Sequence, residues 1–202
     1  MNNQITKNNN VLELGKTYRL AGYYWTACEL INNGETLVIQ SHGVTHGEWP
    51  GYTMPQFGNG NYYGADIDGQ NISAYDDKMQ ALYDTIKDVE DQSAPYGKGL
   101  YLVSREKIGF TEWCKPGSGY YWMALKEVAG SGLGYGYYAW LGTVYGSNGA
   151  WCICPDGAVY CDYQYGSDFV IPPAFNLDLS KVEIVGDEII IMHKENFKDE
   201  EK

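Results

Sequence analysis

The segment from residue 117 to residue 166 constrains the fold of this chain more than any other part of the sequence. It contains 11 of the 25 glycines, and nine of the 19 tyrosines lie in residues 120–165. Dense glycine disfavours long helices, because glycine loses more conformational freedom on folding than any other residue. The pairs Asn148-Gly149 and Asp156-Gly157 are typical of tight hairpin turns. The segment therefore predicts short strands joined by tight turns.

Outside this segment, strand signals lie at the two ends of the sequence. Residues 16–20, 23–28 and 36–40 alternate or are rich in β-branched and aromatic side chains, which predicts an N-terminal meander. Residues 182–185 and 188–192 predict a closing pair of strands. Because strands come first and last with helices between them, the sequence predicts an α+β fold whose N- and C-terminal strands pair in one sheet.

The middle of the chain carries the helix signals. Ser73 can cap a helix, and Asp76 lies three positions further on, which is the spacing of a capping box. An apolar stripe recurs at steps of four and three residues, at Tyr75, Met79, Leu82, Ile86 and Val89. We expect this helix to end before Pro95. A shorter helix is expected over residues 121–128, and a buried strand over residues 99–104.

The two ends of the chain are polar and show no periodicity. We therefore predict disordered tails over residues 1–10 and 194–202. No linker or internal repeat divides the sequence between them, so a single domain over residues 11–193 is expected. Within it, residues 41–69 are dense in turn-forming residues and predict a long irregular excursion.

The charge balance argues against several kinds of partner. Asp and Glu number 26 against 14 Lys and Arg, which gives a net charge of -12 at pH 7. Such an acidic protein is a poor partner for a phosphate backbone, so we expect no nucleic acid. No apolar run approaches the roughly 20 residues that span a bilayer, so no membrane insertion is expected. The first ten residues also lack the apolar run of a signal peptide.

The cysteines predict free thiols. They are odd in number and dispersed, at Cys28, Cys114, Cys152, Cys154 and Cys161. Cys152 and Cys154 would point to the same face of a strand, which suits a disulfide poorly. A zinc site would need a fourth ligand, and the three histidines stand far away in the sequence. We therefore expect no metal and no cofactor.

Catalytic patterns in the sequence are weak. Ser104 and Lys107 have the Ser-x-x-Lys spacing of serine acyl-transferring enzymes, but the companion motifs of those enzymes are missing. Residues 66–71 are similar to the start of a calcium loop, but Gly69 is at the fourth position and not at the sixth. We therefore expect a protein without catalytic activity.

Several stretches carry a resemblance to a known family. They are Tyr-Tyr-Ala-Trp-Leu-Gly at 137–142, Ala-Trp-Cys-Ile-Cys-Pro-Asp-Gly-Ala-Val at 150–159 and Ile-Pro-Pro-Ala-Phe-Asn-Leu-Asp-Leu-Ser-Lys-Val-Glu-Ile at 171–184. The middle of the chain, at 61–69 and 97–104, fits the same group. Over most of its length the chain resembles the variable proteins of diversity-generating retroelements, of the phage and gut-bacterial kind.

This resemblance implies a C-type-lectin fold related to the formylglycine-generating enzymes, with a variable ligand-binding region over about 134–171. In such systems, mutagenic reverse transcription at adenines rewrites selected codons, and Asn, Tyr, Asp, Ser, Gly, Cys, Thr, Phe and Ile are typical outcomes. The implied partner is a protein or surface ligand of a host or target cell. The implied location is a phage virion, in association with the tail, or the bacterial cytoplasm before assembly. Cys154-Pro155-Asp156 departs from the calcium loop of sugar-binding C-type lectins, so calcium-dependent sugar binding is not expected.

The leading hypothesis is a hypervariable ligand-binding protein whose rigid scaffold carries a tyrosine-rich surface. Tyrosine gives broad contact area at low entropic cost, and glycine allows unusual backbone shapes. We expect Trp140, Trp151 and Phe175 in the scaffold. The residues expected to face the ligand are Gly142, Thr143, Tyr145, Ser147, Asn148, Cys152, Cys154, Tyr160, Cys161, Tyr163, Gln164, Tyr165, Asp168 and Phe169.

Two other classes of protein stay open at this point. One is a thiol oxidase-like enzyme of the formylglycine-generating type. The other is a structural virion component in which the tyrosine-rich segment is core, since tyrosine also packs well inside β-rich domains. The identity of the ligand and the oligomeric state are left open.

Overall fold

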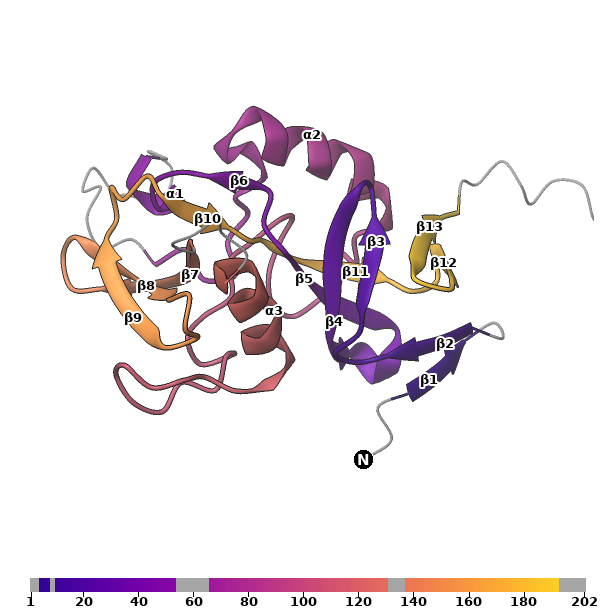
Figure 1. Cartoon of the computed structure of the whole chain (residues 1–202). Coiled ribbons are helices and arrows are strands. Elements are labelled where there is room, and N and C mark those ends of the chain that lie inside the picture. Colours follow the sequence, from indigo (N-terminus) through magenta and orange to yellow (C-terminus); the bar gives the residue numbers. More distant parts are fainter. Residues whose placement is uncertain (1–3, 8–9, 54–65, 131–136, 193–202) are drawn as a thin grey trace, which may run out of the picture.

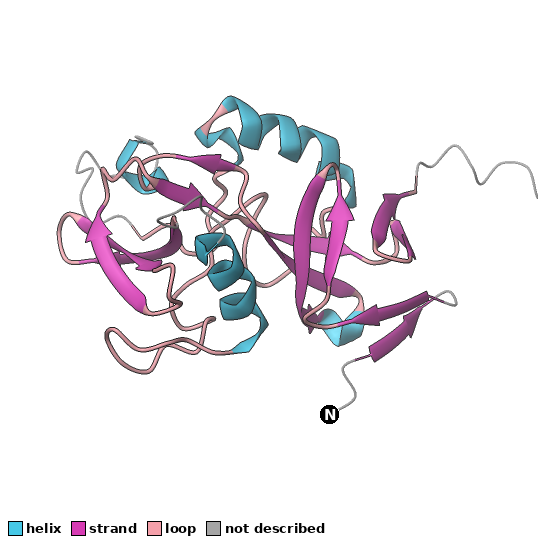
Figure 2. Cartoon of the chain, in the orientation of Figure 1, coloured by secondary structure: helices cyan, strands magenta, loops and turns pink. Residues whose placement is uncertain are grey.

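In the part of the chain that the structure describes, two mixed β-sheets lie toward opposite ends, joined by long loops and accompanied by three α-helices (Figures 1 and 2). This computed structural model describes residues 4–7, 10–53, 66–130 and 137–192. Helix α3 contacts strands of both sheets. The predicted α+β class is therefore confirmed.

The first sheet has six strands in the order β11-β5-β4-β3-β13-β12. Their bounds are β3 Thr17–Leu20, β4 Tyr23–Ile31, β5 Thr36–Ser41, β11 Ala174–Asp178, β12 Val182–Val185 and β13 Glu188–Ile191. The predicted meander and the predicted closing strands are both present. Strand β13 pairs in parallel with β3, where Glu188 is the partner of Arg19. The expectation that the N- and C-terminal strands share one sheet is thus confirmed.

The expected N-terminal tail is instead a hairpin. Strand β1 (Gln4–Lys7) pairs with β2 (Asn10–Glu13) in antiparallel register, and β2 lies against β12. The prediction of a disordered segment over residues 1–10 is therefore wrong for these strands. The polar composition suggested disorder, but a β-ladder forms through hydrogen bonds between backbone groups and does not require apolar side chains. One apolar side chain, Leu12, anchors the hairpin in the main core and is 2% exposed. The other expected tail, 194–202, lies outside the described residues.

The second sheet has five strands in the order β6-β10-β7-β8-β9. Their bounds are β6 Thr45–His46, β7 Tyr138–Tyr145, β8 Gly149–Ile153, β9 Val159–Tyr163 and β10 Phe169–Ile171. Short hairpin connections join β7 to β8 and β8 to β9, and Gly157 in the second turn has a φ of +87°. A positive φ is a conformation that glycine adopts without strain. The prediction of short strands and tight turns is confirmed.

The helices are α1 Pro50–Thr53, α2 Asp77–Ile86 and α3 Gly119–Gly130. The predicted apolar stripe is buried at Met79, Leu82 and Ile86 of α2 and at Val89 of the 3-10 turn that follows, whereas Tyr75, in the 3-10 turn before α2, is half-buried. Helix α3 confirms the shorter helix expected over 121–128. Among the residues described, no helix is both long enough and apolar enough to cross a membrane.

The N-cap of α2 differs from the prediction. Asp76 caps the helix and accepts a hydrogen bond from the Met79 amide at 2.7 Å. Ser73 lies in a preceding 3-10 turn, and its hydroxyl accepts a hydrogen bond from the Leu100 amide at 3.1 Å. Asp and Ser are about equally good N-caps, so the pattern Ser-x-x-Asp did not distinguish them.

Residues 99–104 are buried as expected but form isolated bridges and not a strand. Tyr101 pairs with Ala174 of β11 through two backbone hydrogen bonds, of 3.1 and 2.6 Å. The Val103 carbonyl accepts a hydrogen bond from the Gly142 amide of β7 at 2.9 Å. This segment pairs with each sheet only locally because it crosses from one sheet to the other. It therefore joins the two sheets.

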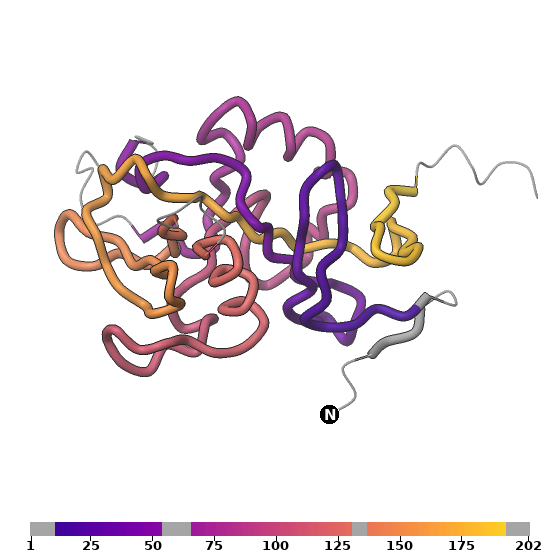
Figure 3. The backbone as a smooth tube through the Cα atoms, in the orientation of Figure 1, coloured from indigo at the N-terminus to yellow at the C-terminus, as the bar shows by residue number. Residues whose placement is uncertain are grey.

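The backbone trace separates the β12–β13 hairpin from the tyrosine-rich strands β8 and β9 (Figure 3). The hairpins β1–β2 and β12–β13 lie at one end of the molecule, and β8 and β9 lie at the other. The irregular excursion expected over 41–69 contains β6 and α1, and its residues 54–65 lie outside the described part of the chain.

Candidate binding surface

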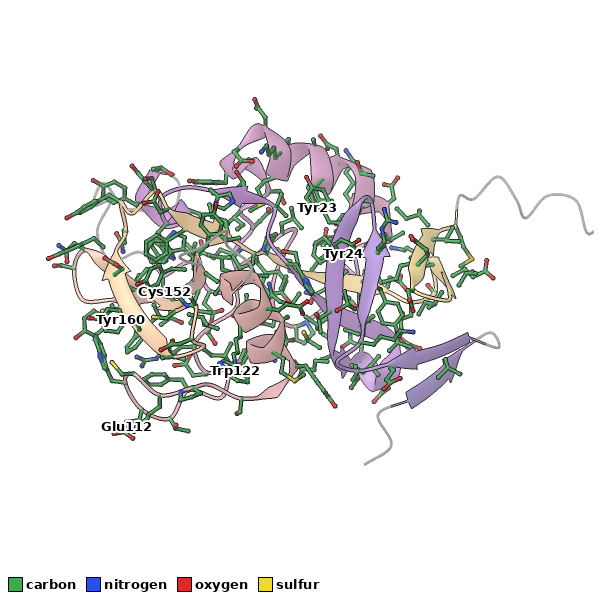
Figure 4. The ribbon with its side chains drawn as sticks, in the orientation of Figure 1. Tyr23, Tyr24, Glu112, Trp122, Cys152 and Tyr160 are labelled. Atoms are coloured by element: carbon green, nitrogen blue, oxygen red, sulfur yellow. The ribbon has the colours of Figure 1, made fainter. Side chains whose placement is uncertain are left out.

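A groove of about 490 Å³ opens along the edge strand β9. It is lined by Trp113, Tyr145, Asn148, Gly149, Tyr160, Cys161, Asp162 and Tyr163. Figure 4 shows Tyr160 on β9, at the end of the molecule away from the terminal hairpins, with Glu112 on the nearby loop. Of the lining residues, Tyr145, Asn148, Tyr160, Cys161 and Tyr163 are predicted ligand-facing residues.

Gly149 lies between two of the tyrosines that line the groove. Gly149 of β8 is directly opposite Tyr145 of β7 on one side and Tyr163 of β9 on the other. A Cβ at position 149 would lie 2.8 Å from the Tyr145 carbonyl oxygen. Glycine thus allows close approach of the neighbouring backbone between two tyrosines, because a larger residue there would press on the Tyr145 backbone.

Trp113 lines the groove but is not among the residues predicted from the sequence to face a ligand. Its ring packs edge-to-face against Tyr145, Trp151 and Tyr160, with centroid distances of 5.1, 5.1 and 5.2 Å. Backbone hydrogen bonds hold its loop against β9: the Cys114 amide donates to the Val159 carbonyl and the Val159 amide to the Lys115 carbonyl. Trp113 lies before the tyrosine-rich segment, so segment composition gave no signal for it. The sequence signal that could have indicated Trp113 is an aromatic residue within a polar loop.

Four predicted tyrosines project into solvent. Tyr145, Tyr160, Tyr163 and Tyr165 are 44%, 39%, 53% and 51% exposed. Tyr163 and Tyr165 stack on each other, with ring centroids 5.2 Å apart and an angle of 12° between the ring planes. These rings are supported by neighbours and remain accessible on one side, as the binding hypothesis requires.

The smaller predicted residues divide between surface and support. Ser147 and Asp168 are exposed, and Asn148, Cys154 and Cys161 are half-buried. Thr143 is also half-buried, and its hydroxyl accepts a hydrogen bond from the Arg105 amide at 3.2 Å. Thr143 therefore helps to hold the 105–118 loop.

Gly142 is buried and does not face a ligand, contrary to the prediction. A Cβ there would lie 2.8 Å from the Asp68 Cα and 2.9 Å from the Leu102 carbonyl oxygen. Its amide and carbonyl both hydrogen-bond to the neighbouring chain, at Val103 and Ile67. Glycine is required here because two backbone segments approach each other closely.

Cys152 is fully buried, also contrary to the prediction. The predicted parity holds, because Ile153 and Cys152 belong to different core clusters on the two faces of β8. The error was to expect one face to be open. Strand β8 lies between β7 and β9, and every one of its residues is buried.

Gln164 and Phe169 are two further corrections, with exposures of 0% and 5%. The Gln164 side-chain amide donates to the Gly149 carbonyl at 3.1 Å, and the Gln164 carbonyl accepts from the Trp49 amide at 2.7 Å. Phe169 stacks on Trp140 with a centroid distance of 3.8 Å. Both residues support the surface from beneath.

The predicted scaffold aromatics are confirmed. Trp140, Trp151 and Phe175 are 1%, 3% and 0% exposed. The Trp140 indole donates a hydrogen bond to the Gly47 carbonyl at 3.1 Å. Trp151 is the floor on which Trp113 and Tyr145 pack.

All five cysteines are free, as predicted. The Cys152 thiol hydrogen-bonds to Cys154, which lowers the pKa of the Cys154 thiol, while burial raises the pKa of Cys152 well above its usual value. Burial also raises the pKa of Cys161. Within the described residues, no group of three or more His, Cys, Asp or Glu side chains could hold a metal ion.

Comparison with protein-family models, with curated proteins and with solved structures finds no match to this chain.

The exposed tyrosines should contribute little to folding. Tyr145→Ala, Tyr160→Ala, Tyr163→Ala and Tyr165→Ala should each lower the free energy of unfolding by no more than about 1 kcal/mol, the value of an aromatic contact. Trp140→Ala empties a buried site and should cost roughly 3–5 kcal/mol. Urea unfolding followed by circular dichroism measures both. If most of the tyrosine variants lose as much stability as the Trp140 variant, the segment is core.

The thiol pair gives a test of the interior of β8. Cys154 should be alkylated by iodoacetamide at pH 7 faster than Cys161, because a lower pKa leaves more reactive thiolate. Cys152→Ala removes the hydrogen bond, raises the pKa of Cys154 and should slow its alkylation by about two- to tenfold. Mass spectrometry of each cysteine peptide measures the rates, with Cys28→Ala as the matched buried control. An unchanged rate in Cys152→Ala would show that the pair does not interact.

Proposed function

We propose that this protein is a non-enzymatic recognition protein whose ligand binds to the tyrosine-rich surface around β9. The observation that carries the proposal is the contrast between neighbouring residues of one segment. Tyr145, Tyr160 and Tyr163 are exposed around a groove, while Trp140, Trp151 and Gln164 are buried beneath it. Accessible aromatic rings held by a rigid base are typical of binding surfaces, where tyrosine and tryptophan contribute much of the affinity.

We further propose that the surface is the variable region of a retroelement-diversified protein with a C-type-lectin-like fold. Support comes from the residue types at the accessible positions, which are Tyr145, Ser147, Asn148, Tyr160, Cys161, Tyr163, Tyr165 and Asp168. Each of these types is a typical outcome of rewriting at adenines. Gln164 is not such an outcome, and it is buried. The proposed variable region thus combines changeable surface positions with fixed supporting positions.

The proposed partner is a protein or surface ligand of a host or target cell, met by a phage virion or a bacterial surface. An open groove lined by four aromatic rings suits a projecting group on a larger partner. Strand β9, which lines the groove, lies at the end of the molecule away from the β12–β13 hairpin (Figure 1). Attachment through the hairpin end would therefore leave the groove accessible.

The two alternatives have less support. A thiol oxidase-like enzyme that used the Cys152–Cys154 pair would have one fully buried thiol, that of Cys152. A purely structural component would place the tyrosines in the core, but four of them are 39–53% exposed. Recognition accounts for both observations.

Two matched libraries test the proposal. The first randomises residues 145, 147, 160, 163, 165 and 168 to Asn, Tyr, Asp, Ser, Gly, Cys, Thr, Phe and Ile, and the second does the same at 140, 142, 151, 152, 164 and 169. Exposed changes cost about 0.5 kcal/mol each, so six of them fit within a stability of about 5–15 kcal/mol, whereas six buried changes exceed it. Protease resistance on a display platform should be retained by most members of the first library and by almost none of the second.

The same display measures binding. Selection of the first library on immobilised lysozyme, used as a probe protein, should enrich binders that carry changes around the groove. Equal survival of the two libraries, or the absence of enriched binders, would overturn the proposal.

A further inference from the structure

We propose that the groove binds a basic side chain, arginine or lysine, that projects from a protein partner. This inference rests on the proposed recognition function and adds the chemistry of the ligand. Three features of the groove carry it: electron-rich rings, a fixed carboxylate and an absence of cations among the lining residues.

The rings form three sides of a partial cage. Trp113 stands between Tyr145 and Tyr160, at angles of 60° and 66° to their planes. All three rings are partly exposed, at 37%, 44% and 39%. The face of an aromatic ring carries partial negative charge, so a cation within about 6 Å of a ring centroid is attracted to it. The chain itself uses this contact beside the groove, where the Arg105 guanidinium lies 5.0 Å from the Trp151 ring centroid.

Asp162 supplies a full negative charge to the lining. The Tyr163 amide donates a hydrogen bond to its Oδ1 at 2.7 Å, which fixes the orientation of the carboxylate. None of the eight lining residues is Lys, Arg or His. The chain as a whole carries a net charge of -12, with no Lys or Arg from residue 127 to residue 180. The field of the protein therefore favours the approach of a cation.

Arg105 and Lys115, two cations of the 105–118 loop, each have an acidic neighbour on that loop and do not neutralise the groove. Arg105 packs over Phe110 and Trp151 and forms an ion pair with Glu106 at 2.9 Å. Lys115 lies on the Trp113 loop, which also carries Glu112. The net charge of the groove and these neighbours is therefore negative.

A projecting side chain fits better than a free small cation. The groove has a volume of about 490 Å³, and Asn148 and the tyrosine hydroxyls offer donors and acceptors to a neighbouring backbone. A flat guanidinium can stack on Trp113 while its N–H groups reach the Asp162 carboxylate.

The experiment titrates three probes into the full chain while the indole resonances of the tryptophans are followed by NMR. The probes are acetyl-Gly-Arg-Gly-amide, its citrulline analogue, which has the same shape without the charge, and methylguanidinium. Trp113→Phe assigns the resonance of Trp113. The arginine peptide should shift this resonance saturably and bind at least about fivefold more tightly than the citrulline peptide. Methylguanidinium should bind more weakly than the arginine peptide.

Asp162→Asn keeps the acceptor for the Tyr163 amide and removes the charge, so it should weaken binding of the arginine peptide by about threefold or more. Asp156→Asn is the matched control. The Oδ1 of Asp156 accepts a hydrogen bond from the Ala158 amide at 2.9 Å, outside the groove, and its replacement should leave binding unchanged.

Equal binding of the citrulline peptide, or an unchanged affinity in Asp162→Asn, would overturn the assignment of a cation. Methylguanidinium binding as tightly as the arginine peptide would replace a protein partner by a free small cation. Tighter binding of methyl α-mannoside than of the arginine peptide would assign the groove to a sugar. If the arginine peptide fails while the surface library still yields lysozyme binders, recognition stands and the basic ligand is wrong.

Discussion

The structure depends on the close backbone contact between Gly142 and the segment 99–104. Tyr101 pairs with β11 of the six-stranded sheet, and Val103 pairs with Gly142 of the five-stranded sheet. Gly142 has no room for a side chain, because a Cβ would meet the Asp68 Cα and the Leu102 carbonyl oxygen within 3 Å. This contact fixes β7 relative to the rest of the molecule. Since β8 and β9 follow from β7 by hairpin pairing, it also fixes the tyrosine-rich surface.

Position in the sheet then decides which residues are accessible at the groove. Strand β8 is covered on both faces and both edges, so its residues support the surface and do not contact solvent. Strand β9 is at the edge, where Tyr160 and Tyr163 reach the groove. Trp113 closes the groove from a separate loop and rests on Trp151. Aromatic residues thus lie beneath the groove, at its side and on its exposed rim.

Local patterns in the sequence predicted the local structure well. Alternation predicted the terminal strands, the three-four spacing predicted the buried face of α2, and Asn-Gly and Asp-Gly predicted the turns. Parity correctly placed Cys152 and Ile153 on opposite faces of one strand. What local patterns could not predict is which faces are covered, because that depends on contacts between distant segments. Gly142, Cys152, Gln164 and Phe169 were misplaced for this reason, and Trp113 was missed for the same reason.

We propose that the accessible positions around β9 are diversified for recognition while the positions beneath them are fixed. The most direct measurement is to sequence the surrounding DNA and compare the gene with a near-copy repeat beside a reverse transcriptase gene. We expect codon differences at adenines that fall on accessible residues between 143 and 168 and spare Gly142, Cys152 and Gln164. Absence of such a repeat, or differences at these three buried codons as often as at Tyr145, Tyr160 and Tyr163, would contradict it.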